Sequence, residues 1–97
     1  MKYNLEFIPT FYTDILTVEE FLKEYPGKTA RIFARIDKTL KQLEEMPEMH
    51  AVYQDVPSFR YIVIEDYLVF YKINERNSTV EVHRLIYGRM DITAKLD

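Results

Sequence analysis

The sequence predicts an α+β fold in which one strand and two helices precede a three-stranded antiparallel meander. Near the N-terminus, apolar and polar residues alternate with the period of two that is typical of a strand. Apolar residues then recur every three or four positions, as on one face of a helix. Three strand-like runs follow, and links of two and four residues join them, as between antiparallel neighbours. We therefore expect a helix pair laid on an antiparallel sheet.

The first two elements are a strand over residues 2–9, which Pro9 ends, and a helix that begins near Phe11. Pro26 ends this helix, because proline disfavours helical geometry in the residue before it. The apolar stripe of the helix is Phe11, Ile15, Val18, Leu22 and Tyr25.

A second helix is expected from about residue 28 to residue 45, and Pro47 ends it. Its apolar stripe consists of Ile32, Ile36, Leu40 and Leu43. Residues 46–58 contain two prolines and no clear period, so we expect an irregular connection there. Spacings of this kind usually place the apolar stripe against a core.

The three remaining strands are expected at residues 59–64, 67–74 and 79–87. The turn "ED" and the loop "ERNS" join them, and Gly88 ends the last strand. The central strand is apolar on both faces, so the face turned away from the helices needs a cover. The C-terminal tail, a partner protein or stacked nucleobases would provide one. The length of 97 residues predicts a single domain, 1–97.

Composition counts against nucleic-acid binding and excludes several kinds of site. The net charge is −3, whereas dedicated nucleic-acid binders usually carry a basic excess. The absence of cysteine excludes disulfides, thiolate zinc sites and cysteine nucleophiles. No apolar run is long enough to cross a bilayer, and the N-terminus lacks the features of a signal peptide, so we expect a cytoplasmic protein without a membrane partner.

Motifs for cofactors and metals are absent as well. The sequence has no glycine-rich nucleotide-binding motif, no HExxH and no EF-hand spacing, and His50 and His83 are its only histidines. A serine triad is not supported, because no nucleophile-elbow sequence surrounds either Ser58 or Ser78. We therefore expect neither a cofactor nor a metal ion.

Polar groups on the last strands are the remaining candidates. Alternation places His83, Leu85 and Tyr87 on one face of the last strand, and Val82, Arg84 and Ile86 on the other. Arg89 is expected where the chain leaves the sheet, next to Tyr87 and Arg60. The groups Arg60, His83, Tyr87 and Arg89 could cleave RNA without a metal, with acid–base groups moving protons and arginine stabilising the phosphate. Structural roles for each residue are the alternative.

The segment "YLVFYKI…TVEVHRLIYGRMDI" resembles the RelE/ParE superfamily of type II toxins. It is most similar to the ParE-like, plasmid-stabilisation branch, in which a "YLVFY-x-V" strand precedes a strand ending in "H-G-R-R-D-I". The stretches "FIPTFYTDILTVEEFLKEY" and "IDKTLKQLEEMP" are similar to the two helices of that family. The resemblance implies a toxin that a cognate antitoxin neutralises, with residues 1–97 as its domain; an oligomer is also possible.

The resemblance implies two alternative targets. ParE-like toxins bind DNA gyrase without chemistry of their own, whereas RelE-type toxins are endoribonucleases that cleave mRNA on the ribosome. Leu68 and Met90 stand where RelE-type enzymes carry arginines, and Tyr61 and Val63 stand in place of their lysines. We therefore expect target binding, with an endoribonuclease as the alternative. Target-binding or antitoxin-binding candidates are Arg60, Arg84, Tyr87 and Arg89.

Overall fold

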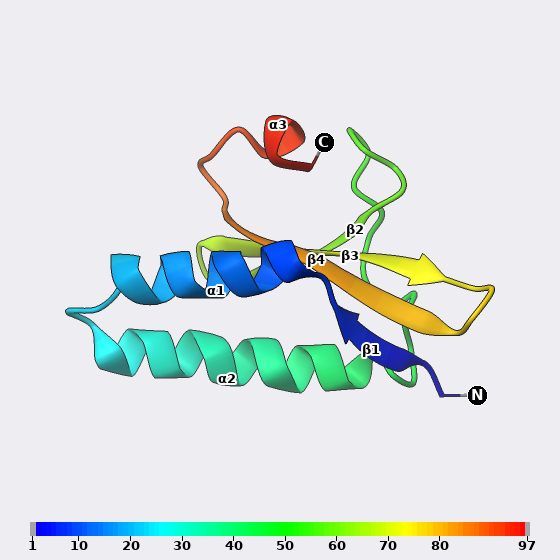
Figure 1. The fold of residues 1–97 in the computed structure, drawn as a ribbon, viewed down its shortest axis with the longest axis horizontal. Helices are drawn as coiled ribbons and strands as arrows, with labels where there is room; N and C mark the ends of the chain where they lie inside the picture. Colours follow the sequence, from blue (N-terminus) through cyan, green and yellow to red (C-terminus); the bar gives the residue numbers. More distant parts are fainter. Residues whose placement is uncertain (1, 97) are drawn as a thin grey trace.

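The computed structural model describes residues 2–96 and has the expected order of strand, helix, helix and meander, followed by one short helix. The α+β class and the turns at 65–66 and 75–78 are thereby confirmed (Figure 1). The final helix was not predicted. The elements are β1 (Asn4–Phe7), α1 (Pro9–Phe21), α2 (Pro26–Gln42), β2 (Arg60–Ile64), β3 (Tyr67–Asn74), β4 (Thr79–Tyr87) and α3 (Ile92–Leu96).

The four strands form one sheet in the order β1-β4-β3-β2. β2, β3 and β4 are antiparallel neighbours, as the short links predict. β1 instead pairs in parallel with β4, with Asn4 opposite Thr79, so the expectation of an antiparallel sheet is wrong at this edge. Parallel strands require a long crossover, and the two helices and the meander provide it.

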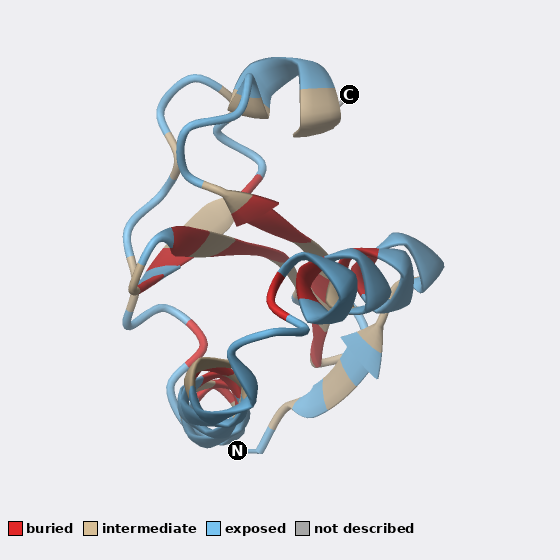
Figure 2. Cartoon of the chain, turned by 90° about the vertical axis from the view of Figure 1, so that its left-hand side faces the viewer, coloured by how far each residue is buried: buried red, intermediate tan, exposed pale blue. Residues whose placement is uncertain are grey.

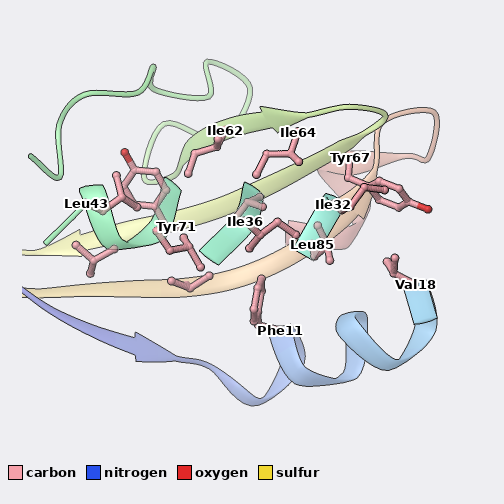
Figure 3. Close-up of a cluster of buried hydrophobic side chains, with 14 of the residues drawn as sticks. Phe11, Val18, Ile32, Ile36, Leu43, Ile62, Ile64, Tyr67, Tyr71 and Leu85 are labelled. Carbon is pink, nitrogen blue, oxygen red and sulfur yellow. The ribbon is translucent and has the colours of Figure 1, made fainter. Parts of the chain in front are cut away.

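Both long helices cover one face of the sheet and run antiparallel to each other (Figure 1). The predicted stripe of α2 is fully confirmed, because Ile32, Ile36, Leu40 and Leu43 are all buried. Figure 2 shows the buried residues of both helices turned toward the sheet, and Figure 3 shows the resulting core. Tyr25 departs from the predicted stripe: α1 ends at Phe21, and Tyr25 is 61% exposed.

A second, smaller cluster covers the opposite face of the sheet. Phe70 and Ile86 from the strands pack with Phe59 from the preceding connection. Ile92 and Leu96 of α3 pack against this cluster, so the C-terminal tail covers part of the apolar face of β3. Within residues 2–96, no helix combines the length and the hydropathy needed to span a membrane.

A β-bulge in β4 changes which side chains share a face. Phe70 of β3 lies opposite Arg84, while the next residue, Tyr71, lies opposite Val82, so one residue of β4 is extra. As a result Val82 and Leu85 belong to the same core. The expected alternation, with Val82, Arg84 and Ile86 on one face, is therefore wrong across the bulge. Because of the extra residue, side chains after the bulge point to the face opposite to the one that strict alternation predicts.

Candidate functional site

A pocket of about 140 Å³ opens between α1, β4 and the segment that follows β4. Its walls are mainly apolar, and Asp14, Arg84 and Lys95 are the charged residues among them. α1 contributes one wall because the helix packs directly on β4. The lining residues are Asp14, Thr17, Val18, Phe21, Tyr67, Arg84, Leu85, Ile86, Tyr87, Met90 and Lys95.

Asp14 and Arg84 form a bidentate ion pair in this pocket. Arg84 Nε donates to Asp14 Oδ2 at 2.7 Å, and Nη2 donates to Oδ1 at 3.0 Å. The Leu85 N–H also donates to Asp14 Oδ2 at 2.9 Å. Asp14 is only 9% exposed, so its carboxylate has exchanged water for three protein donors. The pair joins α1 to β4.

Sequence reasoning missed Asp14, although a signal for it was present. Asp14 lies between Phe11 and Val18, one helical turn from each, and therefore on the apolar face of α1. A carboxylate on such a face requires a partner, because an unpaired buried charge is costly. Arg84, already a candidate from the sequence, is the partner that Asp14 requires.

The third donor of Arg84 holds the C-terminal segment. Its Nη1 donates to the backbone carbonyl of Lys95 in α3 at 2.6 Å. The β-bulge is what brings Arg84 toward α1 and the tail, since a bulge re-aims the side chains that follow it. Arg84 is therefore occupied by structural contacts on both sides.

Aromatic and apolar side chains form the rim of the pocket. The ring of Tyr87 lies 6.4 Å from that of Phe21 and 5.6 Å from that of Tyr67, measured between centroids. Phe21 is 72% exposed and Met90 is 52% exposed. Arg89 lies between the lining residues Tyr87 and Met90 in the chain and is itself exposed.

Arg60 does not lie with Tyr87 and Arg89, and this expectation is wrong. In the sheet register Arg60 is opposite Tyr71, at the start of β2, whereas Tyr87 is opposite Tyr67. Gly88 follows Tyr87 and donates its N–H to the Asp66 carbonyl, in the turn at the other end of β2. Tyr87 and Arg60 are thus separated by nearly the whole length of β2.

Arg60 instead holds the connection that precedes its strand. Its Nη1 donates to the His50 carbonyl at 2.7 Å and to the Glu48 carbonyl at 3.4 Å. Nearby, the Tyr71 hydroxyl donates to the Pro47 carbonyl at 2.7 Å. Burial raises the pKa of Tyr71 to about 12, so this phenol keeps its proton at neutral pH. Both side chains satisfy carbonyls of an irregular segment.

His83 belongs to a third location, on the side of the sheet that carries Phe59. Its ring is edge-on to Phe59 at 5.2 Å, and its Nε2 lies 3.3 Å from Glu81 Oε1. The amino group of Lys72 lies over the Phe59 ring, 4.6 Å from the centroid. The structure therefore separates His83 from Tyr87 and Arg89, which were expected to act together in RNA cleavage.

Tyr67 in the pocket wall keeps its proton at neutral pH. Burial raises the pKa of Tyr67, and Tyr87 and Asp66 add to the shift. The Tyr67 phenol is therefore a hydrogen-bond donor at neutral pH, not a base. In the described residues, no group of three histidine, cysteine or carboxylate side chains is placed to hold a metal ion.

Comparison with solved structures identifies the fold. The chain superimposes on a protein of the chromosomal ParDE toxin–antitoxin system from P. aeruginosa with a TM-score of 0.72 and 14% identity, over 89% of this chain and 96% of that one. It also superimposes on a chain of the toxin–antitoxin complex RelBE2 from Mycobacterium tuberculosis, with a TM-score of 0.63 and 18% identity, over 90% and 99%. The RelE/ParE-like fold is thereby confirmed.

Comparison of the sequence alone assigns the family. A search among curated proteins finds no significant match. The family model described as the ParE toxin of the type II toxin–antitoxin system parDE matches residues 5–92, from β1 to the start of α3. Because this match spans nearly all of the sequence, the chain belongs to the ParE toxin family of type II toxin–antitoxin systems.

Proposed function

We propose that this toxin stops growth by binding DNA gyrase in the cytoplasm, and that a cognate antitoxin encoded beside it neutralises it. In this reading residues 1–97 form one toxin domain that acts as a protein ligand. The single observation that carries the proposal is that the four groups expected for RNA cleavage do not lie at one place. Arg60, His83 and Tyr87 lie in three different parts of the sheet, and only Arg89 is near Tyr87.

This separation matters because metal-independent cleavage needs all its groups at one phosphate. A general base must lie within about 3 Å of the 2′-hydroxyl proton, and a cation must lie near the same phosphate. The guanidinium of Arg60 is committed to two carbonyls, and that of Arg84 to Asp14 and Lys95. A binder has no such requirement, since exposed apolar and cationic side chains are sufficient.

The features of the pocket rim support a binding role. Phe21, Tyr87 and Met90 are apolar or aromatic side chains at the surface, the kind that supplies most of the affinity in protein interfaces. Both neighbours in the fold comparison come from toxin–antitoxin systems. An antitoxin partner for this chain follows from the same family membership.

The two targets separate in paired assays with the purified toxin. Gyrase binding predicts that the toxin inhibits DNA supercoiling in a concentration-dependent way, while primer extension on cellular mRNA shows no new ends. Codon-phased mRNA ends together with normal supercoiling would instead establish the endoribonuclease. An Arg60→Ala variant should still inhibit supercoiling and produce no new mRNA ends. Any weaker inhibition should match its loss of stability.

A further inference from the structure

Large apolar side chains on the rim of the pocket between α1, β4 and the tail are exposed to solvent. Phe21 and Met90 are 72% and 52% exposed, although the burial of large apolar side chains is favourable. Tyr87 is half-buried between them and the core. Exposed large apolar groups gathered around a concavity indicate a contact surface rather than a solvated one.

The floor of the pocket needs no charged ligand. The Arg84 guanidinium donates to the Asp14 carboxylate and to the Lys95 carbonyl, and the Leu85 N–H also donates to the Asp14 carboxylate. An ion inserted here would have to displace one of these contacts. The space itself therefore suits an uncharged, apolar group.

The size of the pocket limits that group to about one ring or branched side chain. The volume is about 140 Å³, and an apolar cavity of roughly 150 Å³ accommodates a benzene molecule. A phenylalanine, leucine or methionine side chain is of the same order. A stacked nucleobase with its sugar and phosphate would need a longer, open surface.

Two cations flank the apolar pocket. Lys95 lines it, and Arg89 lies between the lining residues Tyr87 and Met90. Within residues 2–96, neither cation is paired with a carboxylate, whereas five of the other arginines and lysines on the described surface are. The chain as a whole carries a net charge of −3, so this cationic rim is a local feature. Its complement is a carboxylate next to an apolar side chain.

We infer that this pocket is the anchor site for an acidic segment of the antitoxin, which inserts one apolar side chain and places a neighbouring carboxylate against Arg89 and Lys95. The inference rests on the proposed antitoxin partner and specifies the chemistry that this partner must present. The pocket then selects among antitoxins, because one extra or missing methylene in such a pocket changes affinity by about 10–200-fold.

A small-molecule titration tests the pocket independently of any antitoxin. Phenylpropionate carries a ring and a carboxylate, and phenylpropanol is its uncharged analogue. We expect phenylpropionate to shift the NMR signals of Val18, Leu85 and Met90, and to bind more tightly than the alcohol. In the Arg89→Gln/Lys95→Gln double variant this preference should disappear, whereas Arg76→Gln, in the distant hairpin loop, should retain it. Equal affinity of both probes in the wild-type chain, or tighter binding of AMP at the same residues, would overturn the inference.

A matched pair of tryptophan substitutions tests the role of the pocket in the complex. Thr17 lines the pocket, and Thr13 lies one helical turn away on the exposed surface of α1. Thr17→Trp should fill the opening and weaken binding of the protein encoded by the neighbouring reading frame by on the order of tenfold or more. Thr13→Trp should change that affinity by less than about twofold, within the range of ordinary surface substitutions.

The outcomes separate failure of the anchor from failure of the function. If the neighbouring protein binds the wild type and both tryptophan variants equally, the anchor is wrong and the antitoxin docks elsewhere. If it does not bind the wild type at all, the antitoxin assignment fails, and the phenylpropionate titration still decides whether the pocket accepts an acidic apolar group.

Discussion

Asp14 of α1 and Arg84 of β4 form a two-point ion pair across 70 residues of sequence, with N–O distances of 2.7 and 3.0 Å. The pair fixes one wall of the pocket relative to another. It also connects the pocket to the tail, because the same guanidinium binds the Lys95 carbonyl. Arg84 therefore holds the C-terminal segment together with the apolar packing of Ile92 and Leu96.

Replacing Asp14 should destabilise the protein strongly. Asp14→Asn leaves the partly buried Arg84 without a counter-charge, and removing one partner of a buried pair costs about 3–5 kcal/mol. We expect about 3 kcal/mol, because Arg84 keeps some exposure. Urea unfolding measures this. The matched control, Asp37→Asn, breaks the exposed pair with Lys41 and should cost less than about 1 kcal/mol. Equal losses for both variants would contradict a structural role for the Asp14 pair.

Replacing Arg89 should reduce toxicity without unfolding the chain. Arg89 is exposed, and exposed substitutions usually change the free energy of unfolding by within about 0.5 kcal/mol. Arg89→Ala removes a cation from the rim, so growth inhibition on induced expression should weaken. Arg76→Ala, in the loop between β3 and β4, should stay fully toxic. A fully toxic Arg89→Ala variant with normal antitoxin affinity would remove Arg89 from the site.

Removing the Tyr71 hydroxyl should lower stability through the connection before β2. Tyr71→Phe leaves the Pro47 carbonyl without its donor, and an unsatisfied buried acceptor costs about 1–3 kcal/mol. Thermal unfolding measures the loss. Tyr12→Phe, on the exposed side of α1, is the control and should be close to neutral. A Tyr71→Phe variant as stable as the wild type would mean that water replaces the hydroxyl.

Stability should fall as the pH drops below about 6.5, and His50 should cause part of this loss. Burial lowers the pKa of His50 from its ordinary value of 6.5. Below that pH the unfolded chain takes up a proton that the folded chain excludes, so unfolding becomes more favourable. The loss continues until the pH reaches the lowered folded pKa. His50→Gln should flatten this part of the curve in urea titrations, whereas His83→Gln should leave the His50 component in place.

Replacing Arg60 should act on the connection rather than on catalysis. Arg60→Ala removes the short charge-assisted hydrogen bond to the His50 carbonyl, a kind worth about 1.5–3 kcal/mol, and the longer contact with the Glu48 carbonyl. We expect faster proteolysis of residues 46–53, measured by limited digestion. Any loss of toxicity should follow the loss of folded protein. Complete loss of toxicity in a fully folded Arg60→Ala protein would restore Arg60 as a functional residue.

The element order was predictable because local patterns carry it. The stripe of α2 and the short links of the meander fix helix and hairpins within a few residues of sequence. The partner of β1 was not predictable, since the parallel pair joins Asn4 to Thr79 across most of the chain. The bulge beside Phe70 was missed, because its only mark in the sequence is a spacing of three instead of two between the core residues Val82 and Leu85.

The candidate site shows the same division. Tyr87, Arg84 and Arg89 were named from the sequence, and all three lie at or beside the pocket. Arg60 was misplaced, because the strand register decides which residues of neighbouring strands lie side by side. The sequence alone does not give that register. Asp14 was missed because its role depends on a contact between segments that are distant in the sequence.

The parallel pairing of β1 with β4 determines the stage of synthesis at which the pocket can form. β4 lies between β1 and β3, so the inner part of the sheet is made last. Until residues 79–87 have left the ribosome, β1 has no partner strand, Asp14 lacks Arg84, and the core lacks Val80, Val82 and Leu85. Partly made chains therefore cannot present the finished pocket, which forms in one late step of synthesis.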